Sequence, residues 1–252
     1  MRKGCDHKGD VGKNKFGTKM IIIKFNNQSD IWVEFQDEYK HKKHTNYQAF
    51  LKGEVKNPYD KNIYNVGYLG VGKYSHKTHS KIYDVWNKML KRCYDVCSIS
   101  KYPTYKDCYV CDEWLCFQNF AKWYEENYYG IKDEKMCLDK DILVKGNKIY
   151  SPETCIFVPN RINLLFLKRQ NKRGDLPIGC TSKSKNRIHV TCNCNSGSEH
   201  IKYFNLDEPF RAFTCYKNFK ENYIKEVADE YKGLIPEKLY NAMYNYKIEI
   251  ND

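Results

Sequence analysis

Two short β-like segments followed directly by a proline constrain the fold of this chain more than any other feature. The segments span residues 135–143 and 154–158, with turn-forming residues between them. Pro159 follows the second segment, and proline is favoured in the first turn of a helix because the N–H it lacks would be unbonded there anyway. We therefore predict a strand, a loop, a second strand and a helix reaching about Lys168, which together form a ββα unit.

The balance of charged and aromatic residues limits the class of protein. Among 252 residues, 43 are lysine or arginine and 31 are acidic, which leaves a formal net charge of +12 and a pI near 9.0. This balance favours a polyanionic partner such as nucleic acid or acidic lipid, and the alternative is a basic surface that meets only solvent. Aromatic residues make up 15% of the chain, too many for a disordered polycation, so we expect a folded protein.

The distribution of apolar residues gives no signal for a membrane or for export. Residues 1–15 are charged and lack the apolar core of a signal peptide, and the longest aliphatic run, residues 20–23, is far too short to span a bilayer. We therefore expect a soluble, intracellular protein with no membrane partner. In that reducing setting the 12 cysteines should be thiols or metal ligands rather than disulfides.

The order of segments predicts an α+β protein of three modules, at residues 1–66, 67–173 and 174–252. The first is a small β-rich module, in which β-like runs at 19–25 and 30–35 flank a polar turn. The second holds two helices with aromatic stripes, at 78–94 and 112–128, followed by the ββα unit. The third module begins with three β-like runs and continues with a long helix that has Pro209 in its first turn.

Four cysteines in the second module form two close pairs that are candidates for a structural Zn²⁺ site. They are Cys93, Cys97, Cys108 and Cys111, spaced C-x3-C and C-x2-C with ten residues between the pairs. Each short pair can present two thiolates to one tetrahedral ion. The alternative is that they are small buried residues of an aromatic core, since cysteine is often buried.

Basic residues gather between the second and third modules and on the strands that follow. A cationic linker contains Lys168, Arg169, Lys172 and Arg173. The three β-like runs at 177–181, 187–194 and 200–204 predict a sheet that packs one face on the long helix and exposes the other. Candidates for that exposed face are Lys183, Lys185, Arg187, His189 and Lys202. Such cations can neutralise DNA phosphates and release counterions, and the alternative for the linker is a solvated connector.

Aromatic, cysteine and acidic motifs occur in a fixed order between Tyr83 and Phe166. They are Tyr83 to Trp86 leading to Arg92-Cys93, Val110-Cys111 with Trp114, Phe117 and Phe120, Leu138-Asp139-Lys140-Asp141, Gly146-Asn147, Tyr150 to Cys155, and Asn163. In this order they resemble the HNH-like endonucleases carried by bacteriophages. The resemblance implies metal-dependent cleavage of DNA phosphodiester bonds in the cytoplasm of an infected bacterial host.

The C-terminal block resembles the Apetala-type DNA-binding domain that is often fused to such nucleases. The resemblance is carried by the LPIGC segment, Phe213, Tyr216-Lys217, Lys220 and Tyr223-Ile224. It implies a three-stranded sheet that docks in the major groove of double-stranded DNA. The block contains no tryptophan, a residue that the family uses together with arginine, so base specificity is not carried over. Arg161, on the helix of the ββα unit, is a further candidate DNA contact.

The resemblance to HNH-like endonucleases also implies roles for individual residues. Asp139 and Asn163 would supply oxygen ligands that suit Mg²⁺ or a similar divalent metal. Lys140 stands where the family has its histidine base, and a protonated lysine cannot accept a proton from water. Three alternatives follow for the base: Asp141 replaces it, His76 or His79 supplies it, or cleavage is lost. In place of a base, Lys140 would stabilise the charge of the transition-state phosphate.

Each motif also has a purely structural interpretation. Asp139 and Asp141 can be ordinary turn and salt-bridge residues, and Gly146-Asn147 can form a hairpin turn. The leading hypothesis is a DNA endonuclease, and the second is a catalytically inactive DNA-binding protein that keeps the hairpin as a scaffold. A third hypothesis gives the tyrosine-rich surface a protein-binding role, with no partner indicated.

Overall fold

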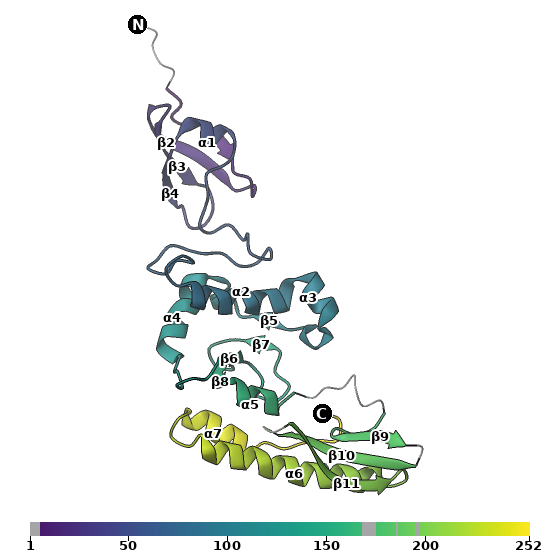
Figure 1. Ribbon diagram of the computed structural model, residues 1–252. Coiled ribbons are helices and arrows are strands. Elements are labelled where there is room, and N and C mark those ends of the chain that lie inside the picture. Colours follow the sequence, from purple (N-terminus) through teal and green to yellow (C-terminus); the bar gives the residue numbers. More distant parts are fainter. Residues whose placement is uncertain (1–5, 168–174, 185, 195–196) are drawn as a thin grey trace. The chain divides into compact units, whose positions relative to one another are not determined.

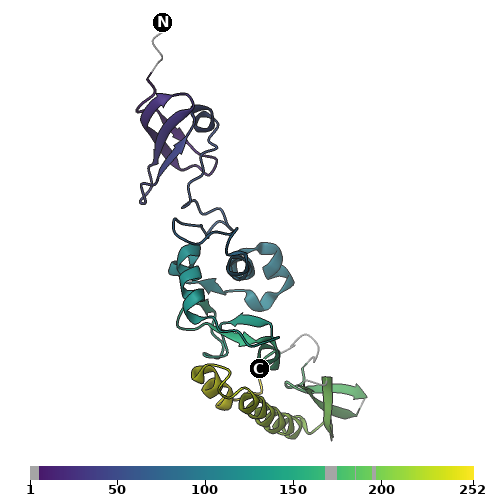
Figure 2. The same ribbon diagram turned by 60° about the vertical axis from the view of Figure 1, so that its left-hand side comes forward.

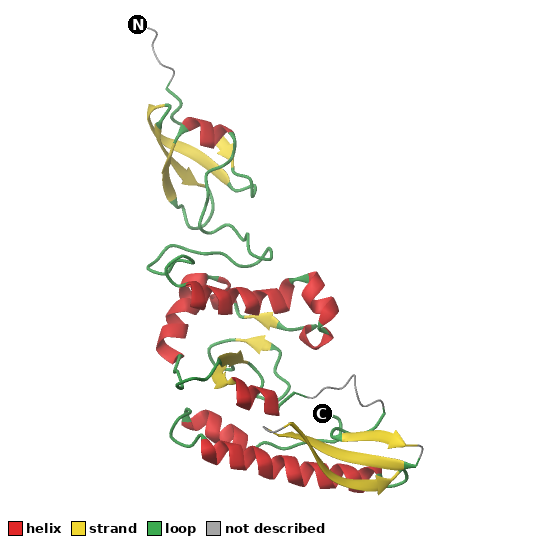
Figure 3. Ribbon diagram, viewed as in Figure 1, coloured by secondary structure: helices red, strands yellow, loops and turns green. Residues whose placement is uncertain are grey.

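A computed structural model describes residues 6–167, 175–184, 186–194 and 197–252 (Figure 1). The chain divides into two compact units, Met1–Glu126 and Asn127–Asp252. Helices and antiparallel sheets occur in separate stretches (Figure 3), which confirms the predicted α+β class. The border between the units lies inside the predicted module 67–173, and the division into three modules stays a prediction.

The first unit begins with a four-stranded antiparallel sheet in the order β1-β2-β3-β4. Its elements are β1 (Val11–Lys13), β2 (Lys19–Asn27), β3 (Asp30–Phe35), β4 (Lys42–Thr45) and the short helix α1 (Tyr47–Leu51). The two predicted strands are confirmed, and the polar turn lies between them. Alternating residues Met20, Ile22, Ile31, Val33 and Phe35 are buried and pack with Phe50 of α1. This sheet therefore has a small hydrophobic core of its own.

The rest of the first unit is helical and aromatic. Its elements are α2 (Ser80–Tyr94), α3 (Val96–Lys101), η1 (Pro103–Tyr105), β5 (Tyr109–Val110), η2 (Asp112–Leu115) and α4 (Phe117–Asn127), whose last residue already belongs to the second unit. Trp86 is fully buried and donates its Nε1–H to the carbonyl of Trp114 at 2.7 Å. The predicted helix at 112–128 is corrected: its first turn is a 3-10 turn, because Cys116 has an extended backbone and separates it from α4.

The second unit starts with the predicted ββα arrangement. It comprises β6 (Met136–Asp139), β7 (Ile149–Tyr150), β8 (Ile156–Pro159) and α5 (Asn160–Leu165), with β6 and β8 antiparallel and Asp139 opposite Ile156. Pro159 is the N-cap residue of α5, so the helix begins where the proline predicts. The first strand is shorter than the predicted 135–143, because the chain turns directly after Asp139.

The C-terminal part of the second unit is a three-stranded antiparallel sheet on a long helix, which Figure 2 shows from the side. Its elements are β9 (Cys180–Ser184), β10 (Arg187–Cys194), β11 (Gly197–Asn205), α6 (Pro209–Glu230) and α7 (Glu237–Tyr244), with sheet order β11-β10-β9. The first strand begins later than the predicted 177–181. Gly179 has a φ of +79°, and a side chain there would collide with Tyr216 of α6, so the strand starts only after this close approach.

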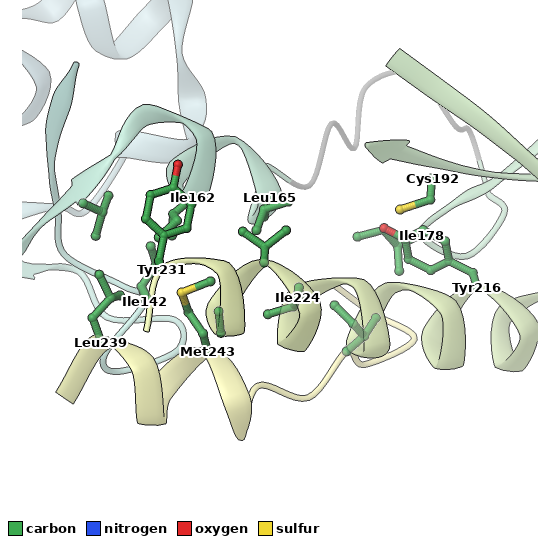
Figure 4. Close-up of a cluster of buried hydrophobic side chains, with 14 of the residues drawn as sticks. Ile142, Ile162, Leu165, Ile178, Cys192, Tyr216, Ile224, Tyr231, Leu239 and Met243 are labelled. Carbon is green, nitrogen blue, oxygen red and sulfur yellow. The ribbon is translucent and has the colours of Figure 1, made fainter. Parts of the chain in front are cut away.

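One hydrophobic core joins the ββα unit to the C-terminal sheet and helices (Figure 4). Ile162 and Leu165 of α5 belong to the same buried cluster as Ile224 of α6 and Met243 of α7. The cluster also contains Val158, Ile188, Val190, Val227 and Leu239, all of them 0% exposed. The hairpin and the sheet are therefore parts of one folded unit. Among the described residues, no helix combines the length and apolar character needed to cross a bilayer.

Candidate functional site

The turn that follows β6 fixes the carboxylate of Asp139. Its Oδ1 accepts the backbone N–H of Asp141 at 2.9 Å and that of Ile142 at 2.8 Å. These two bonds end the strand and hold the side chain in one orientation. No residue that the structure describes donates a hydrogen bond to Oδ2. One oxygen of Asp139 therefore supports the turn and the other is available to a ligand.

Asp139 also ionises at a higher pH than an ordinary aspartate. Burial raises the pKa of this carboxyl group to about 6, and the neighbouring charge of Asp141 adds to the rise. The two backbone N–H groups and Lys140 act in the opposite direction without cancelling it. A carboxylate with a pKa near 6 is a better proton acceptor than an ordinary aspartate, and a bound cation would favour its charged form.

Lys140, at the position where HNH-like endonucleases have their histidine base, is almost completely buried. Its side chain is 9% exposed, and Nζ donates to Asp141 Oδ2 at 3.0 Å and to the carbonyl of Asn147 at 2.7 Å. The Asn147 side chain completes the loop by donating Nδ2 to the carbonyls of Lys140 and Ile149, both at 2.6 Å. Lys140 therefore fastens the two ends of the hairpin loop together.

The C-terminal residues of the chain support the same loop from outside. Lys145 Nζ donates to Asp252 Oδ2 at 2.7 Å and to the carbonyl of Lys247 at 2.8 Å, and its ammonium lies 5.3 Å from the ring of Tyr246. Asp252 is 7% exposed. Burial raises the pKa of Tyr246, and the charges of Asp252, Asp141 and Asp139 add to the rise. Sequence reasoning missed these residues, because nothing in the sequence pairs positions more than one hundred residues apart.

The expected metal ligands lie on the predicted elements. Asp139 ends β6, and Asn163 is a half-buried residue of α5. The described residues contain no cluster of three or more His, Cys, Asp or Glu side chains that could hold a metal. One free carboxylate oxygen and an amide oxygen fit a hard, largely hydrated ion such as Mg²⁺, which often takes only one or two protein carboxylates. The proposed Mg²⁺ site stays a prediction.

The proposed bases and the zinc cysteines belong to the first unit. His76 precedes α2, and His79 is its N-cap residue, with Nδ1 at 2.8 Å from Thr78 Oγ1. Cys93 and Cys108 are buried, Cys111 is half-buried and Cys97 is exposed, and none of the four forms a disulfide. Since described His, Cys, Asp and Glu residues form no metal-binding group, the structure gives the Zn²⁺ site no support, and it too stays a prediction.

The outer face of the C-terminal sheet follows from its register. Ile188 and Val190 of β10 are buried towards α6, so His189 and Thr191 point to the opposite face. His189 pairs with Tyr203 of β11, and Thr191 pairs with His200. Arg187, two residues before His189, lies on this same outer face and is exposed.

The register places Lys202 on the wrong face for the predicted role. It pairs with Val190, which packs towards α6, and its Nζ lies 5.6 Å from the ring of Phe204. The prediction placed Lys202 on the exposed face, but the register shifts by one residue between Val190 and Thr191, so His200 and Tyr203 lie on the outer face while Lys202 pairs with Val190. Lys183 belongs to β9, but the structure does not describe its side chain. The other predicted DNA contacts lie outside the described residues; they are Lys168, Arg169, Lys172, Arg173 and Lys185.

Arg161, the remaining predicted DNA contact, is held inside the second unit. Its guanidinium forms an ion pair with Glu230 of α6 at 2.5 Å and lies 5.5 Å from the ring of Tyr231. The Tyr231 hydroxyl donates to Glu134 Oε1 at 2.6 Å. Hydrogen bonding to Glu230 raises the pKa of Arg161. These contacts position α5 against α6, so Arg161 has a structural role whatever else it binds.

Comparison with known proteins adds no relative. Searches of protein families, of curated proteins and of solved structures gave no match to this chain. The resemblance to phage HNH-like endonucleases therefore depends on the residues described above.

Proposed function

We propose that this protein binds DNA through the outer face of the sheet formed by β9, β10 and β11. The observation that carries the proposal is the chemistry of that face. It presents Arg187, His189, His200 and Tyr203, whereas Glu199, the single carboxylate on the three strands, pairs with Cys192 on the face towards α6. A surface with an arginine, aromatic rings and, among the described residues, no acidic group is complementary to a nucleic acid.

The resemblance to the Apetala-type domain supports double-stranded DNA as the partner. In this proposal the sheet lies against the duplex, and the ββα hairpin supports the sheet through the shared core. Binding of this kind releases counterions, so the affinity should fall steeply with salt. The phage resemblance supports the cytoplasm of an infected bacterial host as the place of action.

Salt-dependent binding of Arg187 variants tests the proposal. Fluorescence anisotropy with a labelled duplex would follow wild type, Arg187→Gln and the control Lys238→Gln, which removes the same charge from the exposed surface of α7. We expect Arg187→Gln to weaken binding several-fold and to lower the slope of log Kd against log salt by about one, as loss of a single phosphate contact does. No binding by wild type in low salt would refute the proposal.

Metal-dependent cleavage of DNA is a second candidate, favoured by the carboxylate of Asp139. Its raised pKa, its available Oδ2 and the position of Asn163 on α5 are consistent with Mg²⁺ held by Asp139 and Asn163. When bound, Mg²⁺ would polarise a phosphate oxygen and lower the pKa of a water molecule. Lys140 would hold the loop in shape and would not take the proton, because its ammonium is committed to Asp141 and Asn147.

A nicking assay separates the two candidates. Supercoiled plasmid would be incubated with wild type and Asp139→Asn in Mg²⁺ or Mn²⁺, with DNA binding measured on the same samples. Cleavage that falls at least a hundredfold in Asp139→Asn, with binding retained, would establish the enzyme. Binding without nicking by wild type would leave the DNA-binding protein alone.

A further inference from the structure

Three aromatic rings form a contiguous group on the outer face of the C-terminal sheet. His189 and Tyr203 are stacked, with ring centroids 4.7 Å apart and planes 18° from parallel. His200 lies 4.5 Å from each of the other two rings. We call Tyr203, His200 and His189 the ring cluster. It spans β10 and β11, the two strands with the longest pairing in this sheet.

The ring cluster has a buried base and an exposed top. His189 is 5% exposed, whereas Tyr203 is 48% exposed and His200 is also exposed. His189 Nε2 and His200 Nδ1 are 2.6 Å apart, so one of these nitrogens donates a proton to the other. This bond and the stack hold the Tyr203 and His200 rings in place before any ligand arrives, which lowers the entropy cost of binding.

The side chains around the cluster are small and polar. Thr181 pairs with His189, Thr191 pairs with His200, and Asn193 and Ser198 pair with each other further along the same face. The rings therefore lie among short side chains, with the guanidinium of Arg187 two residues from His189. An exposed aromatic surface beside a cation is the arrangement on which single-stranded nucleic acids stack their bases.

An intact duplex cannot use such a surface for stacking. The π-faces of its bases are covered by neighbouring base pairs, so a protein side chain in the major groove meets only base edges and methyl groups. An unpaired base exposes its π-face and can stack on an aromatic ring. The ring cluster can therefore form a stacking contact with DNA that contains an unpaired nucleotide and not with an uninterrupted duplex.

We propose that the ring cluster is a stacking site for an unpaired DNA base, and that Arg187 contacts the adjoining phosphate. This inference rests on the proposed DNA-binding function of the same sheet and adds the form of DNA that it selects. The sheet then binds a bulge, gap or flap in preference to an uninterrupted duplex. The preference for an unpaired base resides in the rings of Tyr203 and His200, and Arg187 supplies the electrostatic attraction that does not depend on the form of the DNA.

Three labelled DNA probes of equal length test the proposal with the full-length protein. They are an intact duplex, the same duplex with one bulged thymine, and a single strand of thymidines. We expect wild type to bind the bulged duplex and the single strand about tenfold more tightly than the intact duplex, within the range that stacking on one aromatic side chain provides. Equal affinity for all three probes would overturn the proposal.

Variants of Tyr203 assign the preference to the ring. Tyr203→Leu keeps an apolar side chain without the ring and should abolish the preference for the unpaired base, whereas Tyr203→Phe should retain it. Tyr244→Leu, at a tyrosine on α7 that is 40% exposed, is the matched control and should behave as wild type. Thermal unfolding of each variant would confirm that the sheet remains folded.

The results of these binding experiments separate the stacking site from the proposed DNA-binding function on which it rests. If Tyr203→Leu keeps the wild-type preference, the stacking site is refuted, while duplex binding that depends on Arg187 still supports the proposed function. If wild type binds none of the three probes, the proposed function fails and the stacking site fails with it.

Discussion

The two antiparallel sheets of this protein differ most in how their outward charges are used. In the N-terminal sheet, Trp32 is 39% exposed, and two basic side chains of the neighbouring strand, His44 and Lys42, lie beside acids of β3. His44 contacts Asp30 at 2.9 Å, and Lys42 approaches Glu34 to 3.7 Å. In the C-terminal sheet, by contrast, Glu199 is turned towards α6. A net charge of +12 therefore does not show which surface is open to an anion; the register of each sheet decides it.

The sheets also differ in what stabilises them. The N-terminal sheet is built on its own cluster around Met20, Ile22 and Phe35, whereas Ile188 and Val190 of the C-terminal sheet share a core with the hairpin helix α5. Damage to the hairpin should consequently reach the C-terminal sheet and spare the N-terminal one.

Removal of a core side chain from α5 should destabilise the C-terminal sheet. Ile162 is 0% exposed, and Ile162→Ala should lower the stability of the second unit by about 2–5 kcal/mol. Hydrogen exchange should quicken in β10 as well as in β6 and β8. All four tryptophans precede residue 127, so tryptophan fluorescence should report an unchanged unfolding midpoint for the first unit.

Ile31→Ala in the N-terminal sheet is the matched control, since Ile31 is also 0% exposed. It should shift the midpoint seen by tryptophan fluorescence and leave exchange in β10 unchanged. Fast exchange confined to the hairpin in Ile162→Ala would show that the core is not shared in the way we describe.

Asp30 in the first unit and Asp139 in the second should contribute to stability with opposite dependence on pH. Pairing with Asn26 and His44 lowers the pKa of Asp30, whereas burial raises that of Asp139 from its ordinary 3.8 to about 6. The stability that protonated Asp139 provides is present below about pH 4 and is lost as pH rises through 6. As the pH rises from 4 to 8, the free energy of unfolding of Asp139→Asn should therefore increase relative to that of wild type by on the order of 2 kcal/mol.

Urea unfolding of wild type and Asp139→Asn at several pH values, followed by hydrogen exchange in the second unit, measures this difference. Parallel pH profiles for the two proteins would contradict the raised pKa. Addition of MgCl2 at pH 8 sharpens the result, because stabilisation of wild type but not of the variant would indicate a metal at Asp139.

A carboxylate placed on the C-terminal sheet should make its outer face resemble the N-terminal one. Thr191 is half-buried on that face, opposite His200, and Thr191→Glu should weaken DNA binding about tenfold by repelling phosphates. Thr214→Glu adds the same charge to the exposed side of α6 and should change binding little. Anisotropy with the intact duplex measures both, and equal losses would mean that the sheet is not the contact surface.

The reverse change should give the N-terminal sheet a weak affinity for DNA. In an Arg187→Gln background, Asp30→Asn combined with Glu34→Gln releases His44 and Lys42 from their acidic partners. We expect a two- to threefold gain in binding, because exposed ion pairs are worth little. Glu226→Gln with Glu237→Gln changes the net charge equally on the helices, and a similar gain there would attribute the effect to total charge alone.

Sequence patterns predicted the elements well where the period of burial was regular. The strand at 187–194 and the hairpin around residues 26–29 were confirmed because alternation and turn chemistry are local properties. The prediction that residues 112–115 form the first turn of an α-helix was wrong, since the spacing of their aromatic residues also suits the 3-10 turn that the structure has there. Lys202 was placed on the wrong face because a cation says nothing about which side of a strand it occupies.

The candidate site was predicted only in part. Asp139 and Asn163 lie on the expected elements, but the burial of Lys140 and the support from Asp252 depend on contacts that local sequence does not encode. Lys220 was named only as part of the C-terminal resemblance, and its burial was not predicted: it is 4% exposed on α6, and burial lowers its pKa. Charged residues are usually assigned to the surface, and Lys140, Asp252 and Lys220 are exceptions that only packing reveals.

The shared core has a consequence for the evolution of such proteins. Ile156, Val158 and Ile162 shape the hairpin and at the same time fill the space beneath the C-terminal sheet. Selection on the sheet alone would therefore keep all three residues, so the shape of the hairpin would persist whether or not the hairpin has a chemical role of its own.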